Sequence, residues 1–340
     1  MTTVDRLNEQ DQHLVAHYLQ GFFPQEVYDI HAHPYEPAHF GPAVTQKILP
    51  GLGKAGSAEH RVAMQRVMPG VQTVHGLYFG YPNRDSDRPA INAWVAQEAK
   101  EATPLSRALL LVAPDDDRTA VAAELRSGRY AGLKVYHLFA PRPDTMNAPV
   151  EEYAPEWMWE LLHEVRGVLM LHIVRERAIA DPVNQRALRR LCRAYPNMRL
   201  ILAHVARSFN YRHAREGLQS IADLENVVID TSAVAEAGAY QVALKVLGPK
   251  RVLWGSDYFI SESRGRCVAT GQVFFWLGPD AVLEAAKTPT HFTLVGIESL
   301  LCLREACEDA GLTAGDLEDI FRRNALRVLA PFLPKSAVPA

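Results

Sequence analysis

The chain carries eight short runs rich in Val, Ile and Leu, and most of the segments between them have a helical pattern of apolar positions. Near-continuous apolar runs of this length are typical of strands buried on both faces, as in a parallel sheet. The pattern therefore predicts strands over residues 27–33, 72–79, 107–113, 131–137, 168–174, 199–205, 226–232 and 251–257.

Helices are predicted between these strands, for example over 90–102, 117–128 and 181–195. In the last of these, Asp181 is a candidate N-cap and Pro182 occupies the first helical position. Eight strands alternating with helices favour an α/β fold of the (β/α)8 TIM-barrel type, with extra terminal helices. An open doubly wound sheet is less compatible, because no strand–helix junction carries GxGxxG.

The surplus length is assigned to loops and ends of one domain spanning 1–340, with its core at about 27–330. Two insertions, 34–57 and 258–287, follow the first and last predicted strands, so both are expected over the C-terminal mouth of the barrel. The segment 1–24 is expected to form a helix across the opposite end.

Composition adds exclusions rather than a function. The 36 basic and 39 acidic residues give a net charge of -3, which argues against binding nucleic acid or an anionic membrane through bulk charge. No apolar run approaches the ~18 residues that span a bilayer, and the polar start lacks a signal-peptide core. The four cysteines are scattered, as is usual for reduced thiols, so we expect a soluble cytoplasmic protein.

Polar side chains stand at the C-terminal ends of several predicted strands. His31 and His33 end the first strand, and because alternate side chains of a strand share a face, their imidazoles can converge on one ion. Alone this pattern is weak evidence in a chain with thirteen histidines. Three further strands end at His172, His204 and Asp257, where barrel enzymes place catalytic groups. Together these residues predict a site for Zn²⁺ or another divalent ion.

The ordered strand ends DIHAH, LHI, LAH and GSD, with the segment IFRRNALRVL at 320–329, resemble the amidohydrolase superfamily and in particular its amidohydrolase-2 branch. The resemblance covers about residues 27–330. It implies a divalent metal, with one Zn²⁺ favoured over two ions. The metal ligands that it implies are His31, His33, His172 and Asp257.

The resemblance implies an enzyme, and three functions are compatible with it. The leading one is a hydrolase that cleaves a small amide, ester or lactone with metal-activated water. In it, Asp257 accepts and returns the proton of the water, and His204 polarises a carbonyl or stabilises an oxyanion. The alternatives are a non-oxidative decarboxylase of an aromatic or unsaturated carboxylic acid and a non-catalytic barrel that binds a metal or ligand.

Lys134 ends the fourth strand and is open to three interpretations. With His172 and His204 it can complete a second metal site, it can point a cation at the substrate, or it can extend past the rim into solvent. Asp29 is expected to share the inward face of His31 and His33 and to support one of them.

The substrate is expected to be a small molecule, and its carboxylate, if present, has several candidate partners. Arg175, Arg177, Arg207 and Arg266 are candidates for holding it. Residues 261–278, which include Arg264, Cys267, Phe274, Phe275 and Trp276, suit a lid with a role in specificity. Cys267 is not expected to be a nucleophile. His39, His60 and His75 are expected to be surface or hydrogen-bonded histidines, and His137 is expected to be a loop histidine rather than a ligand. A homo-oligomer is compatible with insertions of this size.

Overall fold

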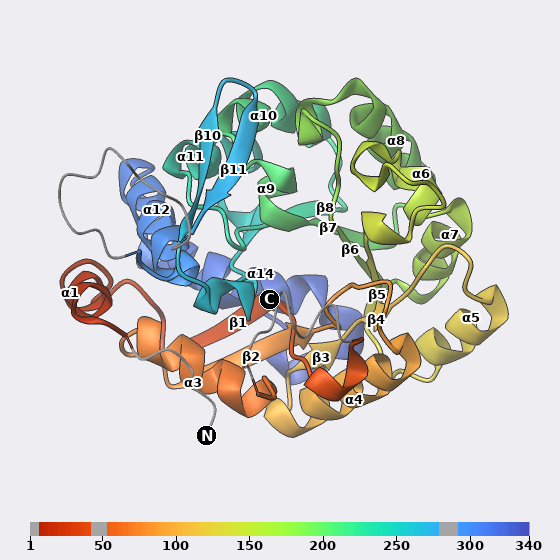
Figure 1. Ribbon diagram of the computed structural model, residues 1–340, viewed down its shortest axis with the longest axis horizontal. Helices are drawn as coiled ribbons and strands as arrows, with labels where there is room; N and C mark the ends of the chain where they lie inside the picture. The colour runs from red at the N-terminus through yellow and green to blue at the C-terminus, as the bar shows by residue number, and fades with distance from the viewer. Residues whose placement is uncertain (1–6, 42–52, 279–291, 340) are drawn as a thin grey trace.

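Parallel strands occupy all eight predicted positions in the computed structural model, which describes residues 7–41, 53–278 and 292–339 (Figure 1). The third predicted strand is split into two short pieces, β3 and β4, with Leu109 between them donating its N–H to Tyr78 O at 2.9 Å. The strands are β1 (Glu26–Ala32), β2 (Thr73–Tyr78), β3 (Arg107–Ala108), β4 (Leu110–Leu111), β5 (Gly132–Val135), β6 (Val168–Leu171), β7 (Arg199–Leu202), β8 (Val227–Asp230) and β9 (Val252–Leu253).

Hydrogen bonds between the first and last strands close the ring. Each strand from β1 to β9 pairs in parallel with the next, apart from the β3–β4 junction. Ile30 N–H donates to Trp254 O at 3.1 Å, and Asp257 N–H donates to His31 O at 2.9 Å. The expected (β/α)8 barrel is therefore present, and its closure brings the two ends of the sequence pattern together.

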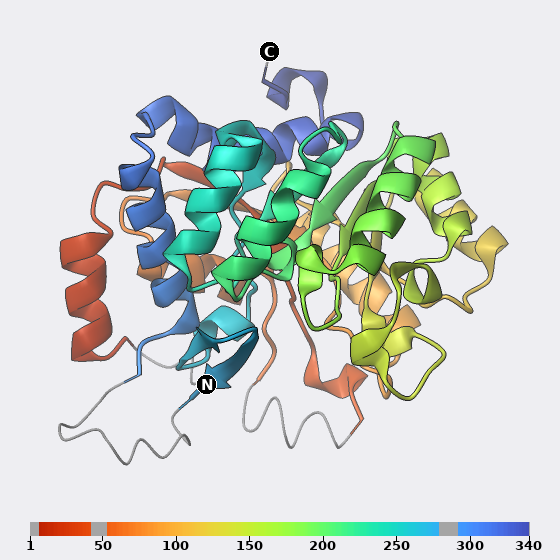
Figure 2. The ribbon, with the colours of Figure 1, turned by 90° about the horizontal axis from the view of Figure 1, so that it is seen from above.

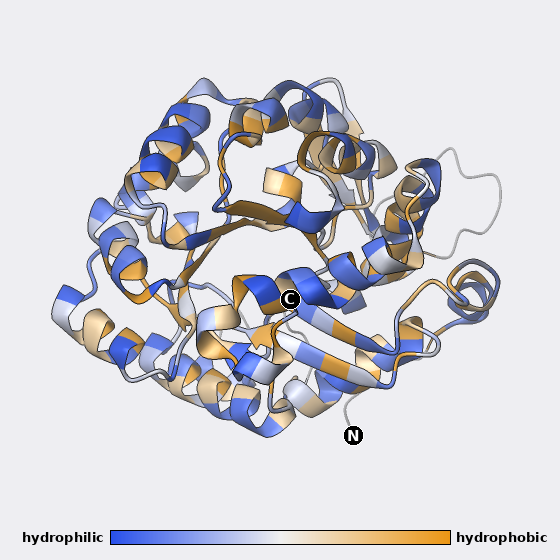
Figure 3. Cartoon of the chain, turned by 180° about the vertical axis from the view of Figure 1, so that it is seen from behind, coloured by the Kyte–Doolittle hydropathy of each residue, from blue (hydrophilic) through white to orange (hydrophobic). Residues whose placement is uncertain are grey.

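Helices surround this ring and turn their polar faces outward (Figure 3). Helix α8 begins as predicted, because the Asp181 side chain accepts a hydrogen bond from Val183 N and Pro182 is its first residue. The longer surrounding helices are α3 (Ser57–Val67), α4 (Arg88–Ala102), α5 (Arg118–Arg126), α7 (Glu156–Val165), α8 (Pro182–Ala194), α10 (Tyr211–Gly217), α11 (Ala237–Leu247) and α12 (Val295–Asp309).

The C-terminal segment, not the N-terminal helix, covers the bottom of the barrel. Leu326 and Leu329, in and just after α14 (Asn324–Val328), belong to the same buried cluster as the inward side chains of the strands. Asn324 Nδ2 donates to Val252 O at 2.8 Å, at the start of β9. The helix expected within residues 1–24 is present as α1 (Glu9–Tyr18), but its expected place was wrong. It lies on the side of the barrel against α12 (Figure 2).

The insertion after the last strand forms a hairpin at the opposite end of the barrel (Figure 2). Strands β10 (Arg266–Thr270) and β11 (Val273–Leu277) pair antiparallel. Residues 42–52 and 279–291, which include parts of both predicted insertions, lie outside the described residues. Within the described part of the chain, no helix combines the length and the apolar character needed to cross a membrane.

Candidate metal centre and active site

The end of β1 carries His31 and His33, and a local irregularity in this strand decides where they point. The pairing of β1 with β2 shifts register between Asp29 and Ala32. Ile30 faces the barrel interior, yet the next residue, His31, also lines the central cavity. Strict alternation predicted that Asp29 shares the face of the two histidines, and this prediction was wrong. The Asp29 carboxylate instead points toward α3, where it accepts a hydrogen bond from His60 Nε2 at 2.8 Å. Such irregularities often redirect side chains beside active sites.

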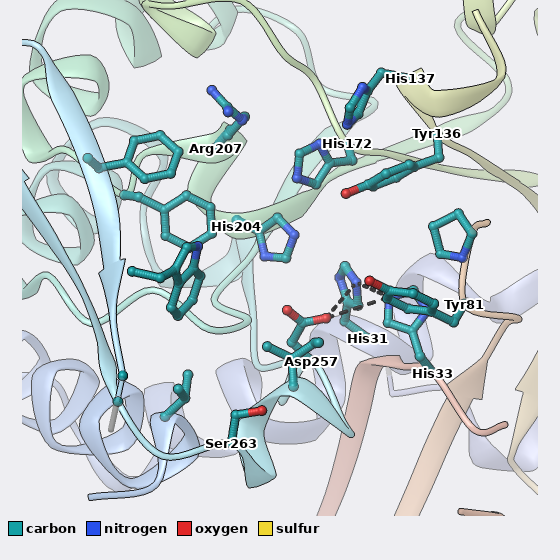
Figure 4. A pocket seen from close by; sticks show the side chains of 18 of the residues that line it. His31, His33, Tyr81, Tyr136, His137, His172, His204, Arg207, Asp257 and Ser263 are labelled. Atoms are coloured by element: carbon teal, nitrogen blue, oxygen red, sulfur yellow. Dashed lines mark hydrogen bonds and ion pairs between the residues drawn. The ribbon is translucent and has the colours of Figure 1, made fainter. Parts of the chain in front are cut away.

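His31, His33 and Asp257 bring three potential ligand atoms together (Figure 4). The two Nε2 atoms are 3.2 Å apart, and Asp257 Oδ1 is 3.4 Å from His31 Nε2 and 3.5 Å from His33 Nε2. Ligands about 2.0–2.1 Å from a tetrahedral ion stand roughly 3.3–3.4 Å from one another. The spacing of the three atoms therefore fits a single small divalent cation.

The outer nitrogens of both histidines are engaged in the way that metal-binding imidazoles require. His31 Nδ1 donates to Asp230 Oδ2 at 2.8 Å, and His33 Nδ1 donates to Gly80 O at 3.2 Å. These bonds fix the tautomer that leaves both Nε2 lone pairs facing Asp257. Burial, together with Lys134 nearby, holds the pKa of His31 well below its usual range, and burial likewise lowers the pKa of His33. Both rings are thus neutral and available as ligands.

Asp230, at the end of β8, is a site residue that the sequence analysis missed. Besides His31, it accepts the backbone N–H of His204 at 2.9 Å through Oδ1, and Ser232 N–H at 3.1 Å. It ends a predicted strand in the same way as His172 and Asp257, so the same rule applied to the run 226–232 would have found it.

Asp257 is buried and adopts a left-handed backbone, with φ of 59°. Burial raises its pKa to about 7; Lys134 opposes the rise, and Asp230 and Asp29 add to it. A left-handed conformation is uncommon for a residue with a side chain and persists where the surrounding structure enforces it. Here it directs the carboxylate at the two histidines.

His204 occupies a left-handed turn that continues through Arg207, with φ values between 52° and 60°. Its Nδ1 lies 2.9 Å from Ser232 O, so this nitrogen carries the proton and Nε2 is an acceptor. Burial lowers the pKa of His204 to about 4, although Asp230 opposes the shift. His204 is therefore neutral, and its free nitrogen accepts rather than donates a hydrogen bond.

Lys134 is buried at 1 % exposure in the cavity wall, so it does not extend past the rim into solvent. Its Nζ lies 4.6 Å from the centre of the Phe79 ring. Burial lowers the pKa of Lys134 to about 8, and the charges of Asp230 and Asp257 oppose this. The lysine thus places a cation close to the carboxylates of the site.

His172 lines the same cavity but does not join the close group of ligand atoms. Its ring packs 5.0 Å from that of His204 and 4.8 Å from that of Tyr136, centre to centre. Unlike those of His31 and His33, its Nδ1 is buried without a hydrogen-bond partner among the described residues. The structure thus places His172 in the same cavity as the other expected ligands, beside His204.

The sequence of residues 28–330 matches the family model described as Amidohydrolase. The chain belongs to this amidohydrolase family. It is therefore an enzyme of the metal-dependent amidohydrolase type, as the strand-end motifs had predicted. No curated protein sequence is significantly similar to it.

Solved structures support the fold of this amidohydrolase. An amidohydrolase from Burkholderia multivorans with bound HEPES has a TM-score of 0.59 at 16% identity, covering 91% of this chain and 99% of that chain. A candidate 2-pyrone-4,6-dicarboxylic acid hydrolase from Pseudomonas putida has a TM-score of 0.55 at 16% identity, covering 92% and 100%. The 2,6-dihydroxybenzoate decarboxylase from Rhizobium has a TM-score of 0.56 at 14% identity, covering 90% and 99%.

His31, His33 and Asp257, called the metal-binding group below, line a cavity of about 780 Å³ in this amidohydrolase. The cavity is large enough for a small organic substrate. Polar, aromatic and cationic side chains from several strand ends and from β11 meet in it. Its described lining includes Tyr81, Lys134, Tyr136, His137, His172, His204, Arg207, Phe209, Arg264, Phe274 and Trp276.

Of the arginines predicted to hold a substrate carboxylate, only Arg207 belongs to the described cavity lining. Arg175 instead pairs with Asp181, with Nε 3.0 Å from Oδ2. Arg266 pairs with Glu298 at 3.2 Å, and Arg177 pairs with Glu216. Because these three cations are held by carboxylates outside the described lining, their predicted role in substrate binding is not supported by the structure.

The structure also shows the surroundings of the cysteine and histidines that the sequence analysis left out of the metal site. Cys267 is buried, and burial raises its pKa to about 12, which agrees with a thiol that is not a nucleophile. His60 is buried and fully hydrogen-bonded, with Tyr78 on one nitrogen and Asp29 on the other. His137 is buried in the cavity wall, with Nδ1 3.1 Å from Thr145 Oγ1.

Proposed function

We propose that this amidohydrolase hydrolyses a small, carboxylate-bearing ester, lactone or amide at a single divalent cation, most simply Zn²⁺. The observation that carries the proposal is the spacing of His31 Nε2, His33 Nε2 and Asp257 Oδ1, 3.2–3.5 Å apart. These three atoms would hold the ion, with His172 a further candidate ligand. Two imidazoles and a carboxylate form a common catalytic ligand set for zinc.

A single ion is preferred because the second group of potential ligands is already engaged. His31, His204 and Asp230 lie close together, but Asp230 accepts hydrogen bonds from His31 Nδ1 and His204 N. His204 Nδ1 is directed at Ser232 O. These bonds serve to orient the ligands of the first ion, which leaves little reason to place a second ion there.

The side chains around the ion have separable tasks. When bound, a divalent cation lowers the pKa of a coordinated water and polarises a carbonyl. The carboxylate of Asp257, buried beside His31 and His33, can take the proton of the attacking water and return it to the leaving group. His204 Nε2 can accept a hydrogen bond from that water and so orient it, while the Lys134 cation can stabilise the negative charge that develops on the carbonyl oxygen. This division differs from the sequence expectation, which gave the carbonyl to His204.

Support for a carboxylate-bearing substrate comes from two sources. Lys134 and Arg207 line the cavity, so its charge favours an anion. In addition, two of the structures similar to this chain are named for unsaturated carboxylic acids, 2-pyrone-4,6-dicarboxylic acid and 2,6-dihydroxybenzoate. A cytoplasmic location is proposed because the four cysteines are buried free thiols.

The test of the metal centre is metal content. Purified His31→Ala and Asp257→Ala are expected to lose most of their bound metal by elemental analysis, and with it at least 100-fold in turnover, because each removes one of few ligands. His13→Ala, an exposed histidine of α1, is the matched control and should keep both. Full metal content in either site variant would contradict the ligand set.

The reaction is tested on a panel of aryl esters, lactones, anilides and unsaturated carboxylic acids in water enriched in oxygen-18. Hydrolysis places one heavy oxygen in the carboxylate product. Release of carbon dioxide from an unsaturated acid, without uptake of heavy oxygen into an acyl product, would instead identify a decarboxylase.

A further inference from the structure

Arg207 is a buried cation that lines the cavity, with 7% of its surface exposed. Its Nη1 donates to Arg175 O at 3.2 Å, and the guanidinium lies over the Phe274 ring, 4.8 Å from the ring centre. Within the described part of the chain, no carboxylate lies within ion-pair distance of it. Burial of a charge without an opposite charge is unfavourable, so it calls for a functional explanation.

The neighbouring arginines show that this lack of a carboxylate is particular to Arg207. Arg264, which also lines the cavity, pairs with Asp11 at 2.9 Å. Arg175 and Arg266 likewise have carboxylate partners. Burial lowers the pKa of Arg207, and the groups that oppose this are the weak acids Tyr136, Tyr153 and Cys267. A bound anion would supply the negative charge that Arg207 lacks among the described residues around it.

Flat side chains stand beside this cation. Phe209 packs 5.0 Å from Phe274 and 5.5 Å from Trp276, and its other neighbour, His204, is 5.2 Å away, centre to centre. Asn210 Nδ2 donates to Gly271 O at 3.1 Å, which ties the turn of the β10–β11 hairpin to the start of α10. The aromatic wall is therefore fixed to the same part of the barrel as Arg207.

One backbone turn connects this wall to the reaction centre. His204 and Arg207 are the first and last residues of the left-handed turn, three positions apart. Figure 4 shows both side chains in the cavity, with Arg207 beyond His204 as seen from His31. A substrate held at Arg207 can therefore extend past His204 to the metal-binding group.

We propose that Arg207, Phe274 and Trp276 form a second subsite, distinct from the metal centre, that binds a carboxylate carried on a flat, unsaturated part of the substrate. The proposal rests on the proposed function, which supplies the reacting end of the same molecule. The guanidinium offers two parallel N–H donors to the carboxylate, and the rings of β11 stack on the flat body.

The charge requirement is tested by titrating the metal-loaded protein with benzoate and with benzamide, which has the same shape but no charge. Arg207→Gln should weaken benzoate binding about 10- to 100-fold, as expected for the loss of a buried charge-assisted bond, and leave benzamide unchanged. Arg207→Lys should fall between. Arg266→Gln is the matched control, because Arg266 lies on the β10–β11 hairpin that carries Phe274 and Trp276 but is outside the described cavity lining. This variant should bind benzoate as the unmodified protein does.

The flat wall is tested with cyclohexanecarboxylate, which keeps the charge but is not planar. Phe274→Leu should reduce the preference for benzoate over cyclohexanecarboxylate at least threefold and leave the effect of Arg207 in place. Equal benzoate affinity in Arg207→Gln and Arg266→Gln would overturn the subsite. Because these readouts measure binding, a failure to find hydrolysis would count against the proposed function alone.

Discussion

Two buried aspartates, Asp29 and Asp230, connect the C-terminal ends of four strands, β1, β7, β8 and β9, around the metal-binding group. Asp230 orients the His31 ring. Asp29 acts through the backbone: it accepts His31 N–H at 3.0 Å and Ser256 N–H at 2.9 Å, as well as the Ser256 hydroxyl. His31 and the neighbour of Ser256, Asp257, are both candidate ligands. One carboxylate thus sets the distance between ligands from the first and last strands.

Asp29→Asn should therefore weaken metal binding without removing a ligand. An amide can accept only through one oxygen, so it cannot reproduce all of these bonds together with the one from His60. Loss of such an outer contact typically lowers metal affinity about 10- to 100-fold. Competition with a chromophoric chelator measures this affinity directly.

Asp319→Asn is the control for a general loss of a buried carboxylate. Asp319 is 7% exposed and pairs with Arg327 at 2.9 Å, far from the metal centre at the other end of the barrel. It should reduce thermal stability and leave the chelator competition unchanged. Equal metal affinities in the two variants would show that Asp29 does not position the ligands.

At the scale of single residues, the sequence predicted which residues belong to the site better than it predicted the contacts that each of them makes. His31, His33 and Asp257 meet as expected because each stands at or just beyond the C-terminal end of a strand of a closed barrel. His172 directly follows β6 and lines the same cavity, so the strand-end rule also predicted the cavity that it enters. Asp29 was assigned to the wrong face because strict alternation cannot anticipate an irregular strand.

Helix α3 carries His60, which holds Asp29, and the first turn of this helix is capped by a residue of another helix. Glu98 of α4 accepts Ser57 N–H at 2.7 Å and the Ser57 hydroxyl at 2.8 Å, and Lys54 Nζ lies 2.7 Å from its other oxygen. A carboxylate at a helix N-terminus satisfies free N–H groups and complements the helix dipole.

Glu98→Gln should lower the free energy of unfolding by about 1–3 kcal/mol at pH 7, the usual range for a buried hydrogen bond to a charged group. Burial alone would raise the pKa of Glu98, but Lys54 and Ser57 outweigh it and hold the pKa below its usual value. The stabilisation is thus fully present above the unfolded pKa of about 4.3 and is lost as the pH falls through the lower folded value.

Urea titrations at pH 7 and near pH 3.5 measure the difference in unfolding free energy between Glu98→Gln and the unmodified protein at each pH. Glu101→Gln, an exposed residue of the same helix, should have little effect at either pH. A gap between Glu98→Gln and the unmodified protein that is as wide in acid as at neutrality would contradict a role for the ionised carboxylate.

Among the elements, strands and helices followed from their apolar patterns, whereas the backbone features that aim the site did not. The left-handed turn from His204 to Arg207 contains no glycine, the residue that usually marks such a conformation. Its stability depends on tertiary contacts such as the bond from His204 N to Asp230. These contacts exist only after strands far apart in the sequence have paired.

In the whole molecule, the residues of the candidate active site and those that close the barrel lie at opposite ends of the barrel axis. The metal-binding group and cavity lie at the C-terminal ends of the strands, and the opposite end is closed by the C-terminal segment. The sequence predicted the barrel and the end that carries the site. It assigned the wrong terminus to the closed end, because both termini have helical patterns and only packing distinguishes them.

Leu326→Ala should therefore destabilise the protein and leave its metal centre intact. Leu326 is 0% exposed and packs under the barrel interior, where removal of a leucine side chain costs about 2–5 kcal/mol. For a protein of this size we expect a fall in Tm on the order of 5 °C. Lys335→Ala, an exposed residue of the same segment, should melt as the unmodified protein does. Since Leu326 lies in the cluster that closes the barrel and the ligands line the cavity at its other end, metal affinity below the melting range should stay unchanged, the reverse of the pattern for Asp29→Asn. A parallel loss of metal affinity would show that the two ends of the barrel are coupled.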